Sequence, residues 1–491
     1  MGIYSELNTN DKYYSVDDTI NGNVNIILRT LDSAIAIFGY IGFNNQGANK
    51  ILYKNQYTKI DYKKIANQMY LPNRPDELYW VKYRMRNNLF DYDIKDHYNN
   101  SNAIVHEFYY SSDLYFAWNP GDRERHHIGT KAQYQYKWVD PSRGELYRPL
   151  VITPPVMINL EEKSMVFADE KEKAIKVIVK AGKDSVKFDL SVSLTKDWGI
   201  RTFESKGSII KQCLIAKKGE EHNFTFYVTP PAKQSEAMMK FTATVDGIEY
   251  SKGIKEIKYD HIPIQTWFPD AEAKLVKLDI KTKSKHIGYI PGAGDEVIQC
   301  LQQLGYEVTT LTDEMLSKED LSKYDAIITG VRAYNTNDKL SNFKPKLMDY
   351  VSNGGNLIVQ YNTNNFIGQM KGDFGPYPFK ITRDRVTDEN AKVNFELPNH
   401  PVLNTPNKIT DKDFEGWIQE RCIYTASDST GKYEMPLSMA DPGEKPNKGS
   451  LIITKHGKGN FIYTGLVFFR ELPAGVPGAY RLFVNMIELG K

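Results

Sequence analysis

The chain has 491 residues, of which 41% are hydrophobic and 25% are charged, and this composition excludes a disordered or low-complexity protein. Its length predicts about three domains of ~150 residues each. Lysine and arginine total 63 against 61 aspartate and glutamate, so the net charge of +2 excludes a global field that would recruit nucleic acid or an anionic membrane.

Cysteine and histidine usage argues against metal or disulfide chemistry. Cys213, Cys300 and Cys422 are too few for a disulfide framework and lack the CxxC spacing of zinc or redox sites. The histidines have no partner at i+3 or i+4, so we expect no metal and no cofactor. The first twenty residues hold no apolar run, and no segment approaches ~20 consecutive apolar residues. We therefore expect a soluble chain with no signal peptide as written and no membrane span.

Residues 1–145 are predicted to form a β-rich, sandwich-like domain. Apolar and β-branched runs occupy 24–28 and 34–41, and aromatic residues mix with alternating polar positions over 103–110 and 114–118. The segment 61–100 has weak periodicity and predicts irregular loops.

Residues 146–260 are predicted to form an immunoglobulin-like (Ig-like) β-sandwich. Four segments alternate between apolar and polar residues and are separated by turn signals, namely 174–180, 187–194, 221–228 and 240–245. The pair Asp246-Gly247 is typical of a two-residue hairpin turn, in which both residues need a positive φ. The paired cysteines of antibody domains are absent from this segment.

Residues 261–491 are predicted to form an α/β domain of the flavodoxin-like type. Short apolar strands at 286–290, 307–310, 326–329 and 356–360 alternate with helical patterns, of which the clearest are 296–304 and 344–353. A hairpin at 450–465 and a closing helix at 479–489 complete it. This alternation predicts a parallel sheet with helices on both faces. The segment 365–445 is read as a long inserted loop, either functional or disordered.

Ligands of open α/β sheets bind beyond the carboxyl ends of the strands, and this rule selects the candidate ligand-binding residues. They are Gly292, Gly294, Asp295, Glu296, Arg332, Tyr334, Asn335, Asn362 and Arg470. Polar and aromatic side chains that converge at one sheet edge suit a glycan or another polar small molecule. The alternative for the first four is a tight turn whose acids complement a helix dipole. For the others it is loop packing.

A second candidate site lies in the insertion. Asp413 and Glu415, beside Trp417, would form an acid/base couple if their carboxyl groups shared one site. A solvated charged loop is the alternative interpretation.

Several segments resemble the C-terminal region of large bacterial deacetylases of the PIG-L (LmbE-like) family. They are 138–141, 144–149, 259–263, 286–296, 324–335, 375–379, 404–408, 413–417 and 472–481. The resemblance covers most of 140–491 closely and the first 140 residues more loosely. It implies Ig-like domains and a domain similar to class I glutamine amidotransferases, joined to an N-terminal zinc-dependent N-acetylsugar deacetylase domain. It also implies an exported, periplasmic or cell-envelope location.

The chain departs from that family at both catalytic centres. The family's His-Pro-Asp-Asp segment and its His-x-x-His motif for zinc do not occur in the 491 residues. The turn matching the amidotransferase nucleophile is Gly330-Val331-Arg332-Ala333, which contains no cysteine, and Cys300 reads as a core residue.

We therefore expect a non-catalytic accessory region from a truncated or split gene. It would bind or position a glycan for a deacetylase domain encoded upstream. A hydrolase with an unrecognised site and a purely structural envelope protein are the alternatives.

Overall fold

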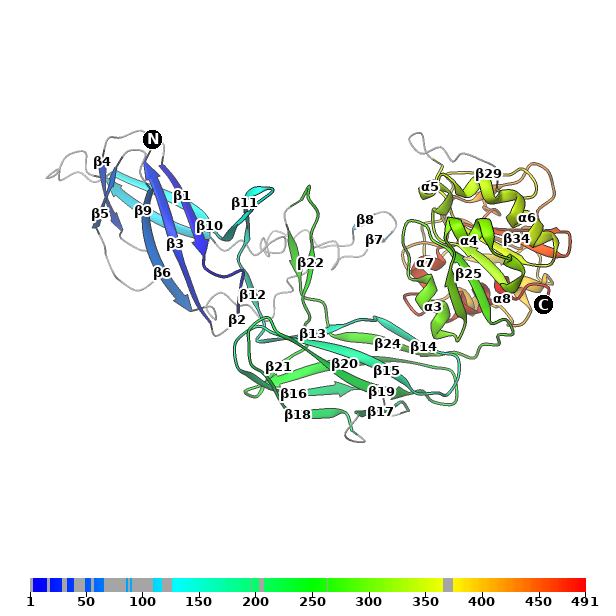
Figure 1. Ribbon diagram of the computed structural model, residues 1–491, viewed down its shortest axis with the longest axis horizontal. Coiled ribbons are helices and arrows are strands. Elements are labelled where there is room, and N and C mark those ends of the chain that lie inside the picture. The colour runs from blue at the N-terminus through cyan, green and yellow to red at the C-terminus, as the bar shows by residue number, and fades with distance from the viewer. Residues whose placement is uncertain are drawn as a thin grey trace.

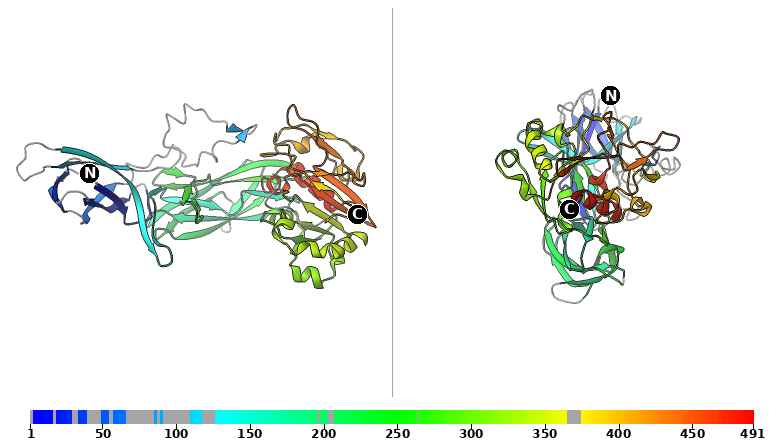
Figure 2. Two further views of the ribbon diagram at one scale, coloured as in Figure 1. Left: turned by 90° about the horizontal axis from the view of Figure 1, so that it is seen from above. Right: turned by 90° about the vertical axis from the view of Figure 1, so that its right-hand side faces the viewer.

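The computed structural model describes residues 3–15, 18–28, 33–38, 49–53, 57–65, 85–86, 89–90, 109–116, 126–195, 197–202, 207–262, 264–364 and 374–491. Figure 1 shows an N-terminal sheet in blue and cyan, a central green sandwich, and a C-terminal part that carries the helices. Figure 2 shows the same three parts in order along the long axis. The expected multidomain, β-rich architecture is confirmed.

The N-terminal part is built around one large sheet, in the order β5-β4-β9-β10-β1-β3-β6, with β11 paired to β10. Its strands are β1 (Ile3–Thr9), β3 (Thr19–Leu28), β4 (Ser33–Phe38), β5 (Asn49–Tyr53), β6 (Tyr57–Ile65), β9 (Tyr109–Phe116), β10 (His126–Asp140) and β11 (Gly144–Pro149). The long strand β10 joins two halves of this sheet, since its first residues pair with β9 and its last residues pair with β1 and β11. β5 lies close to β3 and β6, at the opposite end of the strand order, so the sheet curls back on itself. Short pairs are formed by β7 (Met85–Arg86) with β8 (Leu89–Phe90) and by β2 (Tyr13–Ser15) with β12 (Val151–Thr153). Most of the strand expected at 103–110 lies outside the described residues.

The central part is a sandwich of two sheets. One contains β13 (Val156–Leu160), β15 (Lys173–Ala181), β19 (Glu221–Thr229) and β17 (Gly199–Thr202). The other contains β14 (Ser164–Phe167), β24 (Glu272–Lys277), β20 (Ser235–Val245), β16 (Val186–Ser193), β18 (Ile209–Ile215) and β21 (Ile248–Tyr250). Alternate residues of each strand face a shared apolar core, in which the rings of Phe226 and Phe241 lie 5.1 Å apart.

Two details of the sandwich bear on the sequence predictions. Asp246 and Gly247 have φ of 50° and 81° between β20 and β21, which confirms the predicted hairpin turn. The sheet also continues past residue 260, where the sequence pattern placed the end of the second domain, because β24 pairs with both β20 and β14.

A buried ion pair joins the N-terminal part to a hairpin of the sandwich, β22 (Lys255–Ile257) with β23 (Gln265–Trp267). Arg148, only 2% exposed, donates to Glu256 and, at 2.7 Å, to the Thr266 hydroxyl. Tyr13 lies on β2 (Tyr13–Ser15), which pairs with β12 (Val151–Thr153). Its hydroxyl donates to the same Glu256 carboxylate. Burial opposes the ionisation of Glu256, but its hydrogen bonds outweigh this and lower its pKa to about 2.

This lowered pKa predicts that the ion pair stabilises the fold most above the ordinary glutamate pKa of 4.5. The contribution should disappear as the pH falls towards 2, because the unfolded state then takes up a proton first. We expect Glu256→Gln to lower the free energy of unfolding at pH 7 by on the order of 2–3 kcal/mol, with a smaller loss at pH 3. Urea titrations at the two pH values test this, with the exposed Glu249→Gln as control. An equal loss at both values would contradict it.

The C-terminal part contains a six-stranded sheet in the order β26-β25-β27-β28-β34-β33. Its strands are β25 (His286–Ile290), β26 (Glu307–Thr310), β27 (Ala326–Thr329), β28 (Asn356–Gln360), β33 (Leu451–His456) and β34 (Gly459–Thr464). All neighbours in this order are parallel except β33 and β34. The first four strands have the limits that the sequence predicted.

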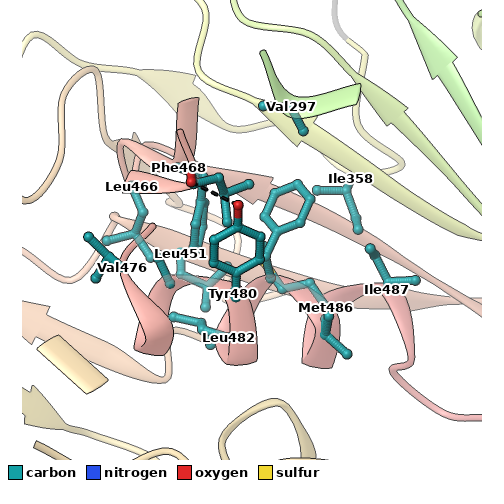
Figure 3. Close-up of a cluster of buried hydrophobic side chains, with 14 of the residues drawn as sticks. Val297, Ile358, Leu451, Leu466, Phe468, Val476, Tyr480, Leu482, Met486 and Ile487 are labelled. Carbon is teal, nitrogen blue, oxygen red and sulfur yellow. Dashed lines mark hydrogen bonds between the residues drawn. The ribbon is translucent and has the colours of Figure 1, made fainter. Parts of the chain in front are cut away.

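Helices cover both faces of this sheet. The longer helices are α3 (Val297–Gln303), α6 (Lys344–Ser352) and α8 (Pro477–Ile487). The shorter ones are α4 (Asp313–Lys318), η2 (Leu321–Lys323), α5 (Ala333–Thr336), η3 (Leu340–Phe343) and α7 (Phe468–Glu471). Alternate residues of the strands divide between two cores: Ile358 packs with α3 and α8, and Leu357 packs with α4 and α6. Figure 3 shows the first core around Tyr480, whose hydroxyl donates to the carbonyl of Leu472 at 2.8 Å.

The insertion, expected to be a loop, has a packed structure where it is described, from residue 374 onwards. It contains β29 (Lys380–Ile381), β30 (Val393–Phe395), η4 (Pro401–Leu403), η5 (Asp411–Phe414), β31 (Ala426–Ser427) and β32 (Leu437–Met439). Trp417 is 3% exposed and Phe414 4%, and both belong to the core around α8. The sequence analysis did not identify Phe414 and Trp417 as core residues, because the apolar residues of the insertion follow neither a helical nor a strand period.

The sandwich and the C-terminal part share one core. Val166, Val276 and Leu278 of the sandwich belong to the same buried cluster as α3 and α8. Polar contacts cross at the same place: the Val166 amide donates to Gln303 at 2.6 Å, and the Ser164 hydroxyl donates to the carbonyl of Pro473 at 2.6 Å. Within the described residues, no helix combines the length and the apolar character that crossing a bilayer requires.

Candidate functional site at the strand ends

The loop after β25 is tied down by its own acid. Asp295 accepts hydrogen bonds from the Tyr289 hydroxyl at 2.6 Å, from the Val297 amide at 3.1 Å and from the Val331 amide at 3.1 Å. These bonds occupy both carboxylate oxygens and join the loop to the turn after β27. Asp295 therefore acts as a structural link at the strand ends, and the neighbouring Glu296 is exposed without capping the helix.

The glycines of this loop serve backbone geometry. A Cβ at Gly292 would lie 2.1 Å from the carbonyl oxygen of Val331, so only glycine allows the two loops to approach so closely. Gly294 has a φ of +100°, which other residues rarely adopt. Both positions match the tight-turn interpretation of this segment.

Asn335 and Asn362 join the turn after β27 to the segment after β28. Asn335 exchanges two hydrogen bonds with the backbone of Thr363, at 2.8 and 3.0 Å. Asn362, fully buried, accepts from the Tyr334 amide at 3.0 Å and donates to the carbonyl of Gln360 at 3.0 Å. Their amide groups thus hold the loops in place, while Tyr334 stacks on Phe374 with ring centroids 4.4 Å apart.

Arg332 lies at the tip of the turn after β27 in a left-handed conformation, with φ of 59° and ψ of 23°. Its amide donates to the carbonyl of Tyr361 at 2.8 Å, so the next strand end fixes the backbone of the turn. The side chain is exposed and forms no hydrogen bond or ion pair within the described residues.

Three aromatic side chains form a mostly buried platform between these loops, since Tyr361 is 9% exposed and Tyr424 and Phe469 are half-buried. Tyr361 directly follows β28 and stacks nearly parallel on Tyr424, with centroids 5.9 Å apart, while Phe469 lies 5.2 Å from Tyr361. Burial raises the pKa of the Tyr361 phenol, and the charges of Arg332 and Arg470 oppose that rise. Both guanidinium groups therefore act on the same ring.

Arg470 and Glu420 complete the site. The Arg470 guanidinium lies 3.2 Å from the Glu420 carboxylate and 5.1 Å from the Phe469 ring centroid. Burial raises the pKa of Glu420, against the opposing charges of Arg470 and Arg385. We call Arg332, Tyr361, Glu420, Tyr424, Phe469 and Arg470 the strand-end site.

Unsatisfied polar atoms gather at the same edge of the sheet. Seven buried polar side-chain atoms of the described residues have no hydrogen-bond partner, and four belong to Thr329, Tyr334, Gln360 and Arg470. Thr329 and Gln360 are the last residues of β27 and β28, and the Gln360 amide donates to the Thr329 carbonyl at 3.2 Å. Buried polar atoms normally find partners, so this cluster indicates a place where a ligand or water is accommodated.

The sequence rule found part of this site. Of the nine residues it selected, Arg332 and Arg470 belong to the strand-end site, and Gly292, Gly294, Asp295, Tyr334, Asn335 and Asn362 shape its loops. The nine residues leave out four members of the strand-end site, namely Tyr361, Glu420, Tyr424 and Phe469. Tyr361 and Phe469 follow strands and fall under the same rule, whereas Glu420 and Tyr424 come from the insertion, where no sequence pattern indicates which strand end they meet.

The second candidate, Asp413 with Glu415, is not arranged as a couple. Asp413 is 3% exposed and accepts from Thr410 at 2.8 Å and from Arg481 at 2.6 Å, while Glu415 is exposed. No group of three or more histidine, cysteine or acidic side chains placed to hold a metal occurs among the described residues.

The thiols are poorly suited to nucleophilic chemistry. Burial raises the pKa of Cys300 and of Cys422 to about 12 each, and it also raises the pKa of Cys213. A protonated thiol is a weak nucleophile.

A cavity of about 430 Å³ lies at the opposite edge, before β27 and β28. Its lining includes Asp325, Lys346, Asp349 and Lys491. Asp325 already accepts from the amides of Lys285 and His286, at 2.8 and 2.9 Å. The strand-end rule did not point to this edge.

Comparison with known proteins leaves the family open. No protein-family model and no curated protein matches the chain. Among solved structures, E. coli alpha-2-macroglobulin in its native conformation is 8% identical with a TM-score of 0.18, and the match covers 56% of this chain and 17% of that one. Red sea bream transglutaminase is 8% identical with a TM-score of 0.21, covering 54% and 31%.

A family 123 glycoside hydrolase from Clostridium perfringens is 12% identical with a TM-score of 0.14, and the match covers 42% of this chain and 37% of that one. The chain thus spans well under two thirds of each of these structures. TM-scores this low carry no argument about function.

Proposed function

We propose that this chain is a glycan-binding accessory region of a PIG-L-type N-acetylsugar deacetylase, and that the glycan binds at the strand-end site. In this proposal the C-terminal sheet is a flavodoxin-like, glutamine amidotransferase-like domain that binds instead of hydrolysing. An exported or cell-envelope location belongs to the same proposal. The observation that carries it is the stacked pair Tyr361–Tyr424, flanked by charged side chains at the carboxyl ends of the strands.

The chemistry of the platform supports a sugar as ligand. An aromatic ring offers an apolar face to the C–H groups of a sugar, and neighbouring polar groups bond to its hydroxyls. Arg470 and Glu420 provide both donors and acceptors beside Tyr361. A site with few convergent polar groups around an apolar surface is typical of small-molecule recognition.

The occupant of the turn after β27 supports binding over catalysis. Amidotransferase-like domains place a nucleophilic cysteine on a strained turn after a central strand, and here Arg332 holds the left-handed position of such a turn. The cysteines with the most strongly raised pKa, Cys300 and Cys422, lie within cores.

We expect Tyr361→Leu to weaken glycan binding about tenfold or more, because leucine keeps most of the buried volume but removes the flat ring. Binding of the purified chain is first located on a glycan array and then measured by calorimetric titration with the glycan that gives the strongest array signal. Tyr147→Leu is the matched control, since Tyr147 is 69% exposed on β11, far along the chain from the site. Equal binding by Tyr361→Leu and the wild type, or no glycan signal at all, would refute the proposal.

A further inference from the structure

We infer that the strand-end site selects glycans that carry a carboxylate, and that Arg332 is the residue that determines this selectivity. This inference rests on the proposed function and narrows it from glycans in general to acidic sugars such as uronates. It is argued from the charges around Tyr361, the backbone of the surrounding loops and the unpaired polar atoms beneath them.

The site holds more positive than negative charge. Arg332 and Arg470 both act on the Tyr361 ring, and Arg385 adds a third guanidinium near Glu420. The opposing carboxylate is Glu420, which is already paired with Arg470. Arg332 has no acidic partner within the described residues, so a ligand carboxylate would complete the charge balance.

Backbone strain concentrates on the same loops. Among the described residues, six non-glycine residues have a positive φ, and three of them are Arg332, Gln419 and Tyr424. Arg332 and Tyr424 belong to the site, and Gln419 precedes Glu420. Glycine would fit the left-handed position of Arg332 with less strain, so an arginine at this position favours a role for its side chain.

The polar atoms beneath the loops give an independent indication of a ligand. Tyr334 and Gln360, 5% and 1% exposed, each have a buried oxygen without a partner, and so does the Thr329 hydroxyl. Arg470 likewise has a buried, unpartnered Nε while its side chain stays 34% exposed. The Tyr334 and Thr329 hydroxyls and the Arg470 Nε can donate, whereas the Gln360 atom is the amide oxygen and accepts. Unpaired donors beside the Arg332 guanidinium favour an anionic ligand group with two acceptor oxygens.

The test compares acidic sugars with their own neutral derivatives. The purified chain is titrated with tetragalacturonate, with its methyl ester and with cellotetraose, and it is applied to an array of uronate- and sialate-bearing glycans printed beside their methyl esters and sulfated counterparts. We expect the free acids to bind about 10- to 100-fold more tightly than the esters, because the esters lose the charge-assisted hydrogen bonds.

Three variants at position 332 separate the guanidinium from the backbone. Arg332→Ala should abolish the preference for the acid, and Arg332→Lys should retain part of it as a point charge. Arg332→Gly should abolish the preference while leaving the melting temperature unchanged or higher, because glycine relieves the left-handed strain. Arg143→Ala, in the turn between β10 and β11, is the matched arginine control.

The outcomes distinguish the two claims. If glycans bind but acids and esters bind equally, if sulfated counterparts bind in place of the carboxylates, or if Arg332→Ala keeps the preference, the inference fails and the proposed function stands. If no acidic or neutral glycan binds, the proposed function fails and the inference with it.

Discussion

Replacing Asp413 by alanine is expected to destabilise the C-terminal part by about 3–5 kcal/mol, the usual cost of breaking a buried ion pair from one side. Asp413 is 3% exposed and accepts hydrogen bonds from Thr410 and from Arg481. Without its carboxylate, the guanidinium of Arg481, whose side chain is 15% exposed, is left largely desolvated. The Thr410 amide also loses its acceptor.

This ion pair connects three parts of the structure, so its loss affects more than the insertion. Asp413 lies on η5 of the insertion, Arg481 lies on α8, and Arg481 also donates to Gln234 of the sandwich at 3.1 Å. A Cβ at Gly478 would lie 1.9 Å from the carbonyl oxygen of Asp413, so the two backbones are in direct contact. Removing the carboxylate therefore weakens the attachment of the insertion to the closing helix.

Glu415→Ala is the matched control, because Glu415 is exposed and two residues away, and it should change the free energy of unfolding by less than about 0.5 kcal/mol. Urea titration of both variants measures the difference. Equal losses in the two variants would contradict the structural role of Asp413. So would a loss in Asp413→Ala below about 1 kcal/mol, which is less than a tenfold change in the unfolding equilibrium.

The burial of Glu471 leads us to expect a large dependence of the stability of the fold on pH. Its carboxyl group is fully buried and accepts from the Ile418 amide at 3.0 and 3.2 Å. Burial raises its pKa to about 8, against the opposing effects of that amide, Arg421 and Arg470. Between pH 4.5 and about 8 the unfolded chain releases this proton while the folded chain keeps it, so stability from this group falls as the pH rises.

Glu471→Gln should remove that dependence. Glutamine resembles the protonated acid, so we expect wild type and variant to be nearly equal in stability near pH 4.5. The variant should become more stable by several kcal/mol towards pH 8, since each pKa unit corresponds to about 1.4 kcal/mol. Urea titrations from pH 5 to 9 test this, with Glu415→Gln as control. A difference that stays constant with pH, or that favours the wild type at high pH, would contradict the burial argument.

The sequence pattern predicted many of the helices and strands correctly, because the spacing of apolar residues and the residues of tight turns are local properties of the chain. The strands 286–290 and 356–360 are short apolar runs bounded by turns, and the structure has β25 and β28 at those positions. The Asp246-Gly247 hairpin was recognisable because two residues with positive φ favour that pair. The first 145 residues had weaker periodicity, and their described strands form a curled sheet in which β5 lies close to β3 and β6.

The sequence by itself determined the alternation of strands and helices, and with it the edge of the sheet where a ligand site was expected. Only the tertiary structure decided which side chains meet there. Asp295 and Asn362 turned out to hold loops together, because their partners are backbone amides and carbonyls of distant turns. Tyr424 and Glu420 entered the site from an insertion without periodicity, since their placement depends on packing over long sequence separations, which no local pattern records.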